Sequence, residues 1–256
     1  MIELTIDKFL ILCPLIFLSA FVDAVAGGGG VISLPAYLFI GLPSHYALGS
    51  NKFSAFCSSI FATVKYITSG NINIKAAIWS AVGAMAGAAA GSSLALYIPE
   101  SALKTIMLVA LPVVAIVLIV RKDNMMKPEK KDYPHAKTVL ISVFIGVSMG
   151  IYDGMVGPGT GTFMIMMFSA MLGYDLLTAG GCAKLSNLAS NLGSLFVLIL
   201  SGKVVYALAI PAAICGAFGA RMGAKFAIKG GSKNIRYFMF IVLGLLFVKF
   251  AIELFA

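Results

Sequence analysis

The sequence predicts an all-α polytopic membrane protein made of two tandem, inverted repeats, each with a broken or re-entrant helix near its start. Three observations predict this fold: the composition, apolar runs of helical length, and a pattern of residues that occurs twice. Of the 256 residues, 60% are hydrophobic and 11% are charged, which is too apolar for a typical soluble domain. The net charge of +9 comes from basic residues at the ends of apolar runs, which favours topology determinants over a nucleic-acid surface.

The apolar runs are continuous and about 18 to 25 residues long, the length with which an α-helix crosses a bilayer, whereas a β-barrel would show short alternating segments. The expected spans are 9–26, 46–68, 75–98, 103–121, 137–156, 176–199, 204–227 and 235–254. Two shorter apolar pieces, 31–41 and 161–172, follow glycine clusters and cannot cross alone. We expect the first span to be retained rather than cleaved as a signal peptide, because Glu3 and Asp7 offset the positive charge before it.

Residues separated by 132 positions match along much of the chain, and upstream the separation is 130. The matched pairs are Gly49 with Gly181, Lys52 with Lys184, Ser54 with Ser186, Ser58 with Ser190, Asp23 with Asp153, Gly27 with Gly157 and Gly29 with Gly159. This pattern predicts a first repeat over 1–121, a basic cytoplasmic linker over 122–136 and a second repeat over 137–256.

The orientation of the repeats depends on the broken elements 9–41 and 137–172. If each is a hairpin, the copies are inverted, and 13 lysine and arginine residues lie on the cytoplasmic side against four outside. If each is one kinked span, the copies are parallel and the distribution is 11 against six. The positive-inside rule favours the inverted arrangement, while both remain open.

Two lysines fall inside predicted spans. Lys52 and Lys184 each lie about 10 Å from the start of a helix, taking 1.5 Å per residue. An ionisable side chain at that depth indicates a functional site by default, and we expect the two ammonium groups to attract an anion near the bilayer centre. The alternative is snorkelling, in which the long side chain reaches the lipid headgroups.

Amide and hydroxyl groups accompany both lysines. Asn187 and Asn191 share a helical face with Lys184, at spacings of three and seven residues. Ordinary hydrogen bonding between helices is the alternative for any single serine. The predicted solute-binding residues are Asn51, Lys52, Ser54, Ser58, Lys184, Ser186, Asn187, Ser190 and Asn191.

The glycine clusters add a second kind of anion site. A helix that begins after unwound backbone at membrane depth presents free N–H groups, so the sequence predicts anion cradles, with flexible turns as the alternative. The cradle residues are Gly28, Gly29 and Gly30 in the first repeat and Gly159, Thr160 and Gly161 in the second. Asp23 and Asp153 precede the two breaks, and each could carry a coupling proton, coordinate a cation or cap the broken backbone.

Chemistry other than transport has little support. The four cysteines are scattered without a C-x-x-C pair, and no arrangement of nucleophile, base and orienting group is present. We therefore expect no enzyme activity, no catalytic residue, no metal and no cofactor.

The segments Gly-Ser-Asn-Lys at 49–52 and Ala-Lys-Leu-Ser-Asn-Leu-Ala-Ser-Asn at 183–191, together with the glycine breaks and the duplication, resemble the sulfite exporter TauE/SafE family. The resemblance covers nearly the whole chain. It implies a multi-pass carrier in the cytoplasmic membrane of a bacterium or archaeon, with sulfite, sulfoacetate and related sulfur-containing organic anions as substrates. Its motif positions here are Asn51, Lys52, Lys184, Asn187 and Asn191; the first half lacks the paired asparagines, so the two copies are not equivalent.

The sequence thus predicts a secondary transporter for a small anion, working by alternating access at the repeat interface. The expected partners are an anionic solute and the lipid bilayer but not nucleic acid, and a homo-oligomer is left open. The alternative is a membrane-embedded structural or interaction subunit, which would place Lys184 on the outside of the bundle. The direction of transport and the coupling ion are not predicted.

Overall fold

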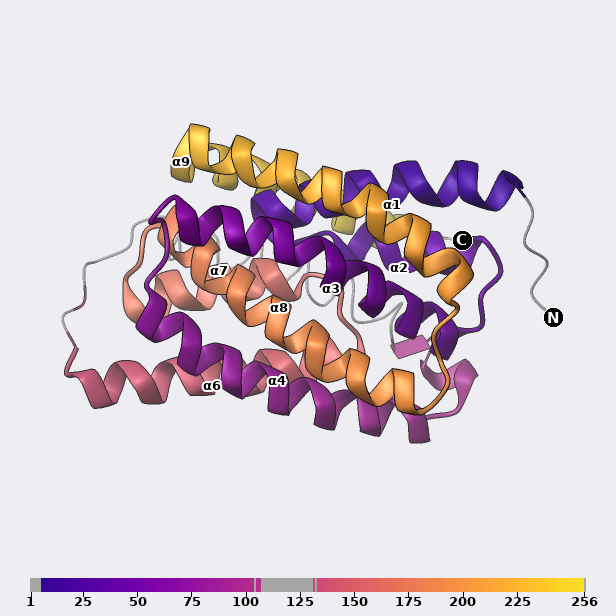
Figure 1. The fold of residues 1–256 in the computed structure, drawn as a ribbon, viewed down its shortest axis with the longest axis horizontal. Helices are drawn as coiled ribbons and strands as arrows, with labels where there is room; N and C mark the ends of the chain where they lie inside the picture. Colours follow the sequence, from indigo (N-terminus) through magenta and orange to yellow (C-terminus); the bar gives the residue numbers. More distant parts are fainter. Residues whose placement is uncertain (1–5, 104, 107–130, 132, 256) are drawn as a thin grey trace.

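The computed structural model describes residues 6–103, 105–106, 131 and 133–255, with side chains through residue 241. These residues form an all-helical bundle without strands, which confirms the predicted fold class (Figure 1). The helices are α1 (Ile6–Ala26), α2 (Gly30–Phe39), α3 (Ser44–Thr68), α4 (Ile74–Tyr97), α6 (His135–Met155), α7 (Thr160–Leu172), α8 (Leu176–Leu200) and α9 (Tyr206–Phe255).

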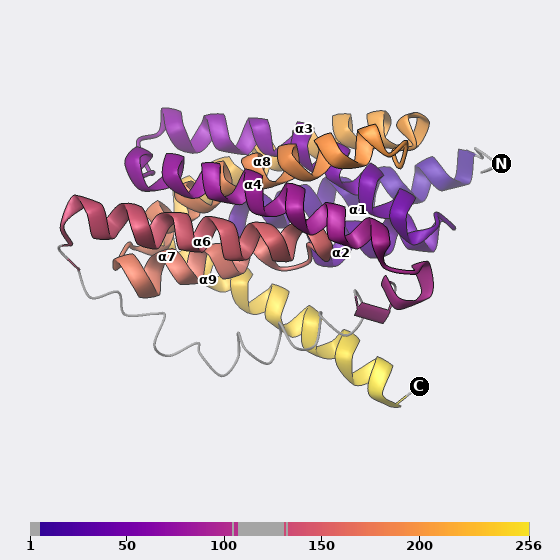
Figure 2. The ribbon, with the colours of Figure 1, turned by 90° about the horizontal axis from the view of Figure 1, so that it is seen from below.

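Among the described residues, five helices are long and apolar enough to cross a membrane: α1, α4, α6, α8 and the Tyr206–Ile241 part of α9. Helix α3 also has the length, with 25 residues, but it is more polar because it carries two lysines and a series of serines. The two spans expected over 204–227 and 235–254 are the two parts of α9, which meet at a kink at Gly231 with non-helical backbone angles. The second part runs obliquely to the other helices (Figure 2). The expected span 103–121 and the linker 122–136 lie largely outside the described residues.

Helices α2 and α7 are too short to cross a bilayer alone, with 10 and 13 residues. Each follows a break that contains glycine in the left-handed region, with φ of 79° at Gly27 and 91° at Gly157. The breaks touch, because the Thr162 amide donates to the Gly27 carbonyl oxygen at 3.1 Å. A Cβ atom at Gly27 would lie 2.2 Å from the backbone carbon of Gly161, so this position requires glycine for its backbone angle and for space.

Helices α3 and α8 pack side by side in opposite directions (Figure 1). Gly49, near the start of α3, contacts the loop that follows α8, where its Cβ would lie 2.1 Å from the Lys203 carbonyl oxygen. Gly181, near the start of α8, makes the same contact with Asn71 in the loop that follows α3, again at 2.1 Å. The loop after α8 therefore packs on the start of α3, and the loop after α3 packs on the start of α8.

Glycine stripes let the outer helices approach closely, as expected for packing without a hydrophobic drive. A Cβ atom at Gly87 of α4 would lie 2.5 Å from the Val147 carbonyl oxygen of α6. One at Gly219 of α9 would lie 2.1 Å from the Phe17 carbonyl oxygen of α1. Gly87 corresponds to Gly219 and Phe17 to Val147 in the sequence repeat, so these contacts too are exchanged between the halves.

Candidate solute site

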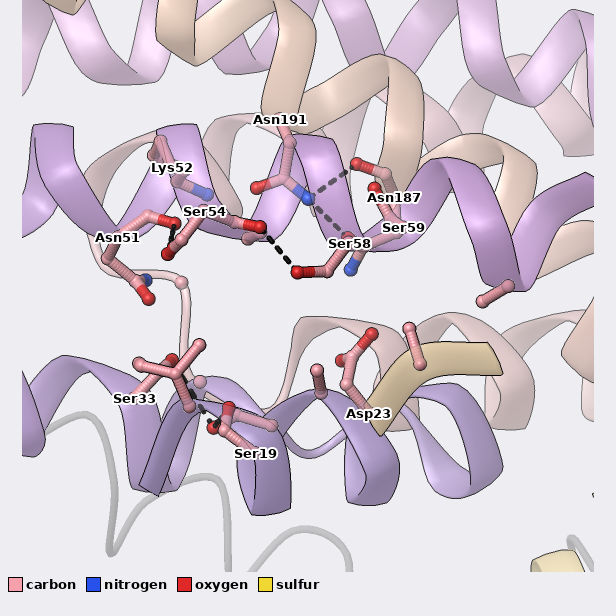
Figure 3. Close-up of a pocket in the computed structure, with 18 of the residues that line it drawn as sticks. Ser19, Asp23, Ser33, Asn51, Lys52, Ser54, Ser58, Ser59, Asn187 and Asn191 are labelled. Atoms are coloured by element: carbon pink, nitrogen blue, oxygen red, sulfur yellow. Dashed lines mark hydrogen bonds between the residues drawn. The ribbon is translucent and has the colours of Figure 1, made fainter. Parts of the chain in front are cut away.

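A polar cavity of about 60 Å³ lies between α1, α2 and α3 of the first half and α6, α8 and the second glycine break of the second half (Figure 3). A volume of this size has room for a few water molecules or a small solute. Its polar side chains are Ser19, Asp23, Ser33, Asn51, Lys52, Ser54, Ser58, Ser59, Asp153, Asn187 and Asn191. Most of the lining comes from the first half, so the cavity is off-centre with respect to the sequence repeat.

The first ion pair of the site joins α3 to α6. The Lys52 Nζ atom lies 2.7 Å from Asp153 Oδ2, and the two side chains are only 2% and 5% exposed. The Ser190 hydroxyl of α8 donates to the same carboxylate oxygen. Asp153 thus links three helices, and it accepts from a cation and a hydroxyl where no bulk water is available.

The second ion pair joins α8 to α1. The Lys184 Nζ atom lies 2.7 Å from Asp23 Oδ2 and also donates to the Asp23 backbone carbonyl oxygen. This carbonyl, in the last turn of α1, also accepts from the Gly27 amide at 2.8 Å, so Lys184 is its second donor. The Lys184 side chain is 0% exposed whereas that of Asp23 is 25% exposed, and Figure 3 shows the Asp23 carboxylate pointing from α1 toward α8.

The two ion pairs are reciprocal. The lysine of each half binds the aspartate of the other half, and both partners correspond in the sequence repeat. Because a buried charge is costly unless it is paired, each lysine depends on the opposite half for its stability. Both ammonium groups end on carboxylates inside the bundle, so snorkelling does not describe them.

Pairing also changes the electrostatics expected from the sequence. We expected two uncompensated positive charges, but Lys52 and Lys184 are balanced by Asp153 and Asp23. The matched aspartates of the repeat were the signal that could have predicted the pairs. The burial of Lys184 also differs from the outward position that a purely structural subunit would give it.

Six of the nine predicted solute-binding residues line the cavity. They are Asn51, Lys52, Ser54, Ser58, Asn187 and Asn191. Within α8, the Asn191 amide donates to the Asn187 carbonyl oxygen at 2.9 Å and to its side-chain oxygen at 2.5 Å, so the two asparagines act as one unit.

The other three predicted residues lie away from the cavity lining. Lys184 and Ser190 instead hold the two aspartates in place. Ser186 faces α4, where its hydroxyl lies 2.9 Å from that of Ser80. They contribute to the positions of the cavity groups rather than to its surface.

The predicted glycine cradles behave differently in the two halves. Gly29 and Gly30 line the cavity, whereas Gly28 does not. In the second half, Gly157 lines it, while Gly159, Thr160 and Gly161 lie outside the lining. The Thr160 hydroxyl donates to the Gly157 carbonyl oxygen at 2.7 Å, so this segment stabilises the break.

Two serines of the site, Ser19 and Ser33, were not predicted from the sequence, whereas Ser59 is the counterpart of Asn191 in the repeat. Ser19 lies one helical turn before Asp23, and this spacing was a readable signal. Ser33 is a single hydroxyl in an apolar piece and gave none. Tyr37 was not predicted from the sequence either. Its fully buried hydroxyl donates to Ser54 at 3.0 Å and fixes α2 against α3.

Several known proteins are similar to this chain over most of its length. The chain is 33% identical over 229 residues to the probable membrane transporter protein ORF9 of Sinorhizobium sp, which covers 88% of this chain and 85% of that protein. It is 32% identical over 226 residues to the probable membrane transporter protein YfcA of Escherichia coli (strain K12), with 88% and 82% covered. A probable membrane transporter protein of Haemophilus influenzae is 30% identical over 237 residues, with 91% of each chain covered.

No solved structure matches the chain. The family described as Sulfite exporter TauE/SafE matches residues 12–250, which is nearly the whole sequence. With this match and five apolar helices of membrane-spanning length, the chain is a multi-pass membrane protein that belongs to the TauE/SafE family of membrane transporters.

Proposed function

We propose that this protein is a secondary transporter for a small anion, sulfite or a related organosulfonate, which binds in the cavity between the two halves. The observation that carries the proposal is the pair of reciprocal buried ion pairs beside that cavity. A solute held at this place touches groups from both halves. Movement of one half against the other would then change the side from which the solute is reached.

Inverted repeats are part of the proposal. Their support is the opposite direction of α3 and α8, the exchanged contacts of the glycine stripes, and the distribution of lysine and arginine in the sequence. In this arrangement α1–α2 and α6–α7 are the broken elements, and each short helix returns toward the side from which its partner entered. Non-helical backbone at that depth is tolerated because it is packed inside the protein.

The groups that would hold the anion are amides and one lysine. Lys52 and the Asn187–Asn191 pair both line the cavity on the side that faces Ser33 and Asp23 (Figure 3), so polar groups from both halves reach one space. Because the Lys52 ammonium already binds Asp153, an anion gains full access to it only when the carboxylate is neutralised or moves away. This requirement supports a coupling role for Asp153 and Asp23 in addition to their part in the ion pairs.

Counterflow in proteoliposomes tests the proposal. Purified protein should exchange labelled sulfite or sulfoacetate, and sulfate and taurine serve as competitors that define the substrate class. The Lys52→Gln variant should lose most of this exchange, because it removes the charge at the cavity. Lys65→Gln is the matched control, since Lys65 lies in the exposed last turn of the same helix. Equal exchange by Lys52→Gln and wild-type protein would overturn the proposed site.

A further inference from the structure

The serine hydroxyls of the cavity are already committed as donors. Each gives its single proton to a backbone carbonyl, so only its oxygen lone pairs remain for a ligand. The bonds run from Ser19 and Ser33 to Gly29, from Ser54 to Asn51, from Ser58 to Ser54, and from Ser59 to Phe56. This part of the wall therefore presents hydrogen-bond acceptors rather than donors.

Asn51 adds an acceptor that has no partner. Its side chain is 7% exposed, and its Oδ1 atom makes no hydrogen bond to any described residue. Figure 3 shows this amide pointing from α3 toward the wall that carries Ser33. A buried polar atom without a partner is unusual in a folded protein, so the position favours a bound group that carries a proton or a positive charge.

The accessible charge beside this wall is negative. Asp23 is the more exposed carboxylate of the two ion pairs, at 25% against 5% for Asp153, and it lines the cavity. Its partner Lys184 is fully buried behind it and does not line the cavity. Carboxylate, hydroxyl and amide oxygens together are the ligands that hard cations prefer.

We propose that the cavity binds a monovalent cationic group between Asn51 of α3 and the facing wall that carries Ser33 and Asp23, next to the anion. The group is either a free sodium ion or an ammonium group carried by the solute itself. This inference rests on the proposed anion transport and explains its charge balance. While both aspartates stay ionised, the two lysines and two aspartates sum to zero, so an anion alone would leave a net negative charge in a buried site; a cationic group then restores neutrality in place of a neutralised Asp153.

Thermal unfolding of the purified protein in detergent tests for the cationic group without transport. Sodium chloride is titrated into a choline chloride buffer at constant ionic strength, with no organic solute present. We expect the midpoint to rise saturably with sodium for wild-type protein. Asn51→Ala and Ser33→Ala should each weaken the apparent sodium affinity about tenfold, because each removes an oxygen ligand. Ser148→Ala, at an exposed hydroxyl on α6, should keep the wild-type response.

A second arm repeats the titration in choline buffer with two sulfonates that differ only in an amino group. Stabilisation by the aminosulfonate alone, lost in Asn51→Ala, would identify the solute's ammonium as the cationic group. Absence of stabilisation by sodium and equal binding of the two sulfonates would overturn the inference. So would a sodium response that both Asn51→Ala and Ser33→Ala retain, because the site would then lie elsewhere.

The inference and the transport proposal can fail separately. One outcome is sulfite exchange that depends on Lys52 but not on sodium, on a solute amino group or on Asn51. This result would overturn the cation site and support anion transport. Sodium-dependent stabilisation without any anion exchange would support the cation site and overturn anion transport.

Discussion

The ammonium group of Lys52 on α3 lies 2.7 Å from the carboxylate of Asp153 on α6, and the corresponding pair of Lys184 and Asp23 repeats this contact with the halves exchanged. Exchanged contacts of this kind are what a two-fold relation between similar units produces. The same exchange occurs in the glycine contacts of the outer helices, so it extends through the bundle. The ion pairs are therefore the polar centre of the interface between the halves.

Breaking the buried pair from one side should be strongly destabilising. Asp153→Ala leaves the Lys52 ammonium buried without a partner, which typically costs about 3–5 kcal/mol. The double variant Lys52→Met with Asp153→Leu removes both charges and should recover most of the lost stability, although we expect it to lose anion exchange. Unfolding in detergent compares the three proteins. An Asp153→Ala protein as stable as the wild type would contradict the prediction that the buried Lys52 ammonium depends on this partner.

Gly27, in the first break, should tolerate substitution less well than a glycine in an ordinary turn. Gly27→Ala should abolish folding, because the position combines a φ of 79° with a Cβ atom 2.2 Å from the backbone of Gly161. Gly41→Ala is the matched control, since Gly41 has a φ of 87° but nothing within 4 Å of its Cβ. Only the strain of the left-handed conformation remains there, about 1–2 kcal/mol. The yield of monodisperse protein after detergent extraction distinguishes the two, and similar yields would argue against close contact between the breaks.

The sequence predicted the parts of the site better than their pairing. The duplication identified both lysines and both aspartates, because matched charged residues in apolar segments stand out. It did not identify which lysine binds which aspartate, since Asp23 and Lys52 of one half are close enough along the chain to pair with each other. Only the tertiary structure shows that the partners come from opposite halves, because it brings α3 to α6 at the first ion pair and α8 to α1 at the second.

The serines of the cavity were harder to predict for a physical reason. A hydroxyl in a helix can satisfy itself on a carbonyl of the preceding turn, so a lone serine in an apolar segment has little meaning by itself. Ser33 does so in this structure, on the Gly29 carbonyl, and still lines the cavity. Its role depends on what faces it, which is a property of the tertiary arrangement.

Asp175 should make the start of α8 sensitive to acid. Burial raises the pKa of its carboxyl group, but hydrogen bonds from Thr178, Leu177 and Ser232 outweigh that effect, and the pKa lies below its ordinary value of 3.8. A lowered pKa in the folded state stabilises the protein above the unfolded-state pKa, and this contribution is lost as the pH falls below 3.8 and through the folded-state pKa.

The Asp175→Ala variant should therefore lose about 0.5–2 kcal/mol at neutral pH, as for other N-cap residues. The difference from wild type should shrink on acidification below the ordinary value. Asp175→Asn keeps a capping oxygen without titrating, so it should retain most of the stability at neutral pH. Unfolding midpoints of the three proteins as a function of pH check this, and a pH-independent difference between wild type and Asp175→Ala would show that the charge has no part in the cap.

The orientation of the two repeats can be decided from two loops. Thr68 ends α3 and Ser201 follows α8, and both positions are exposed. If the repeats are inverted, the first loop is cytoplasmic and the second is on the opposite side, whereas in parallel repeats both are cytoplasmic. Thr68→Cys and Ser201→Cys, each in a background with the four native cysteines replaced by alanine or serine, are treated in intact cells with a membrane-impermeant maleimide. We expect labelling at position 201 and protection at 68 until the cells are opened. Protection at both positions in intact cells would establish parallel repeats, and the two breaks would then be kinks in continuous spans rather than hairpins.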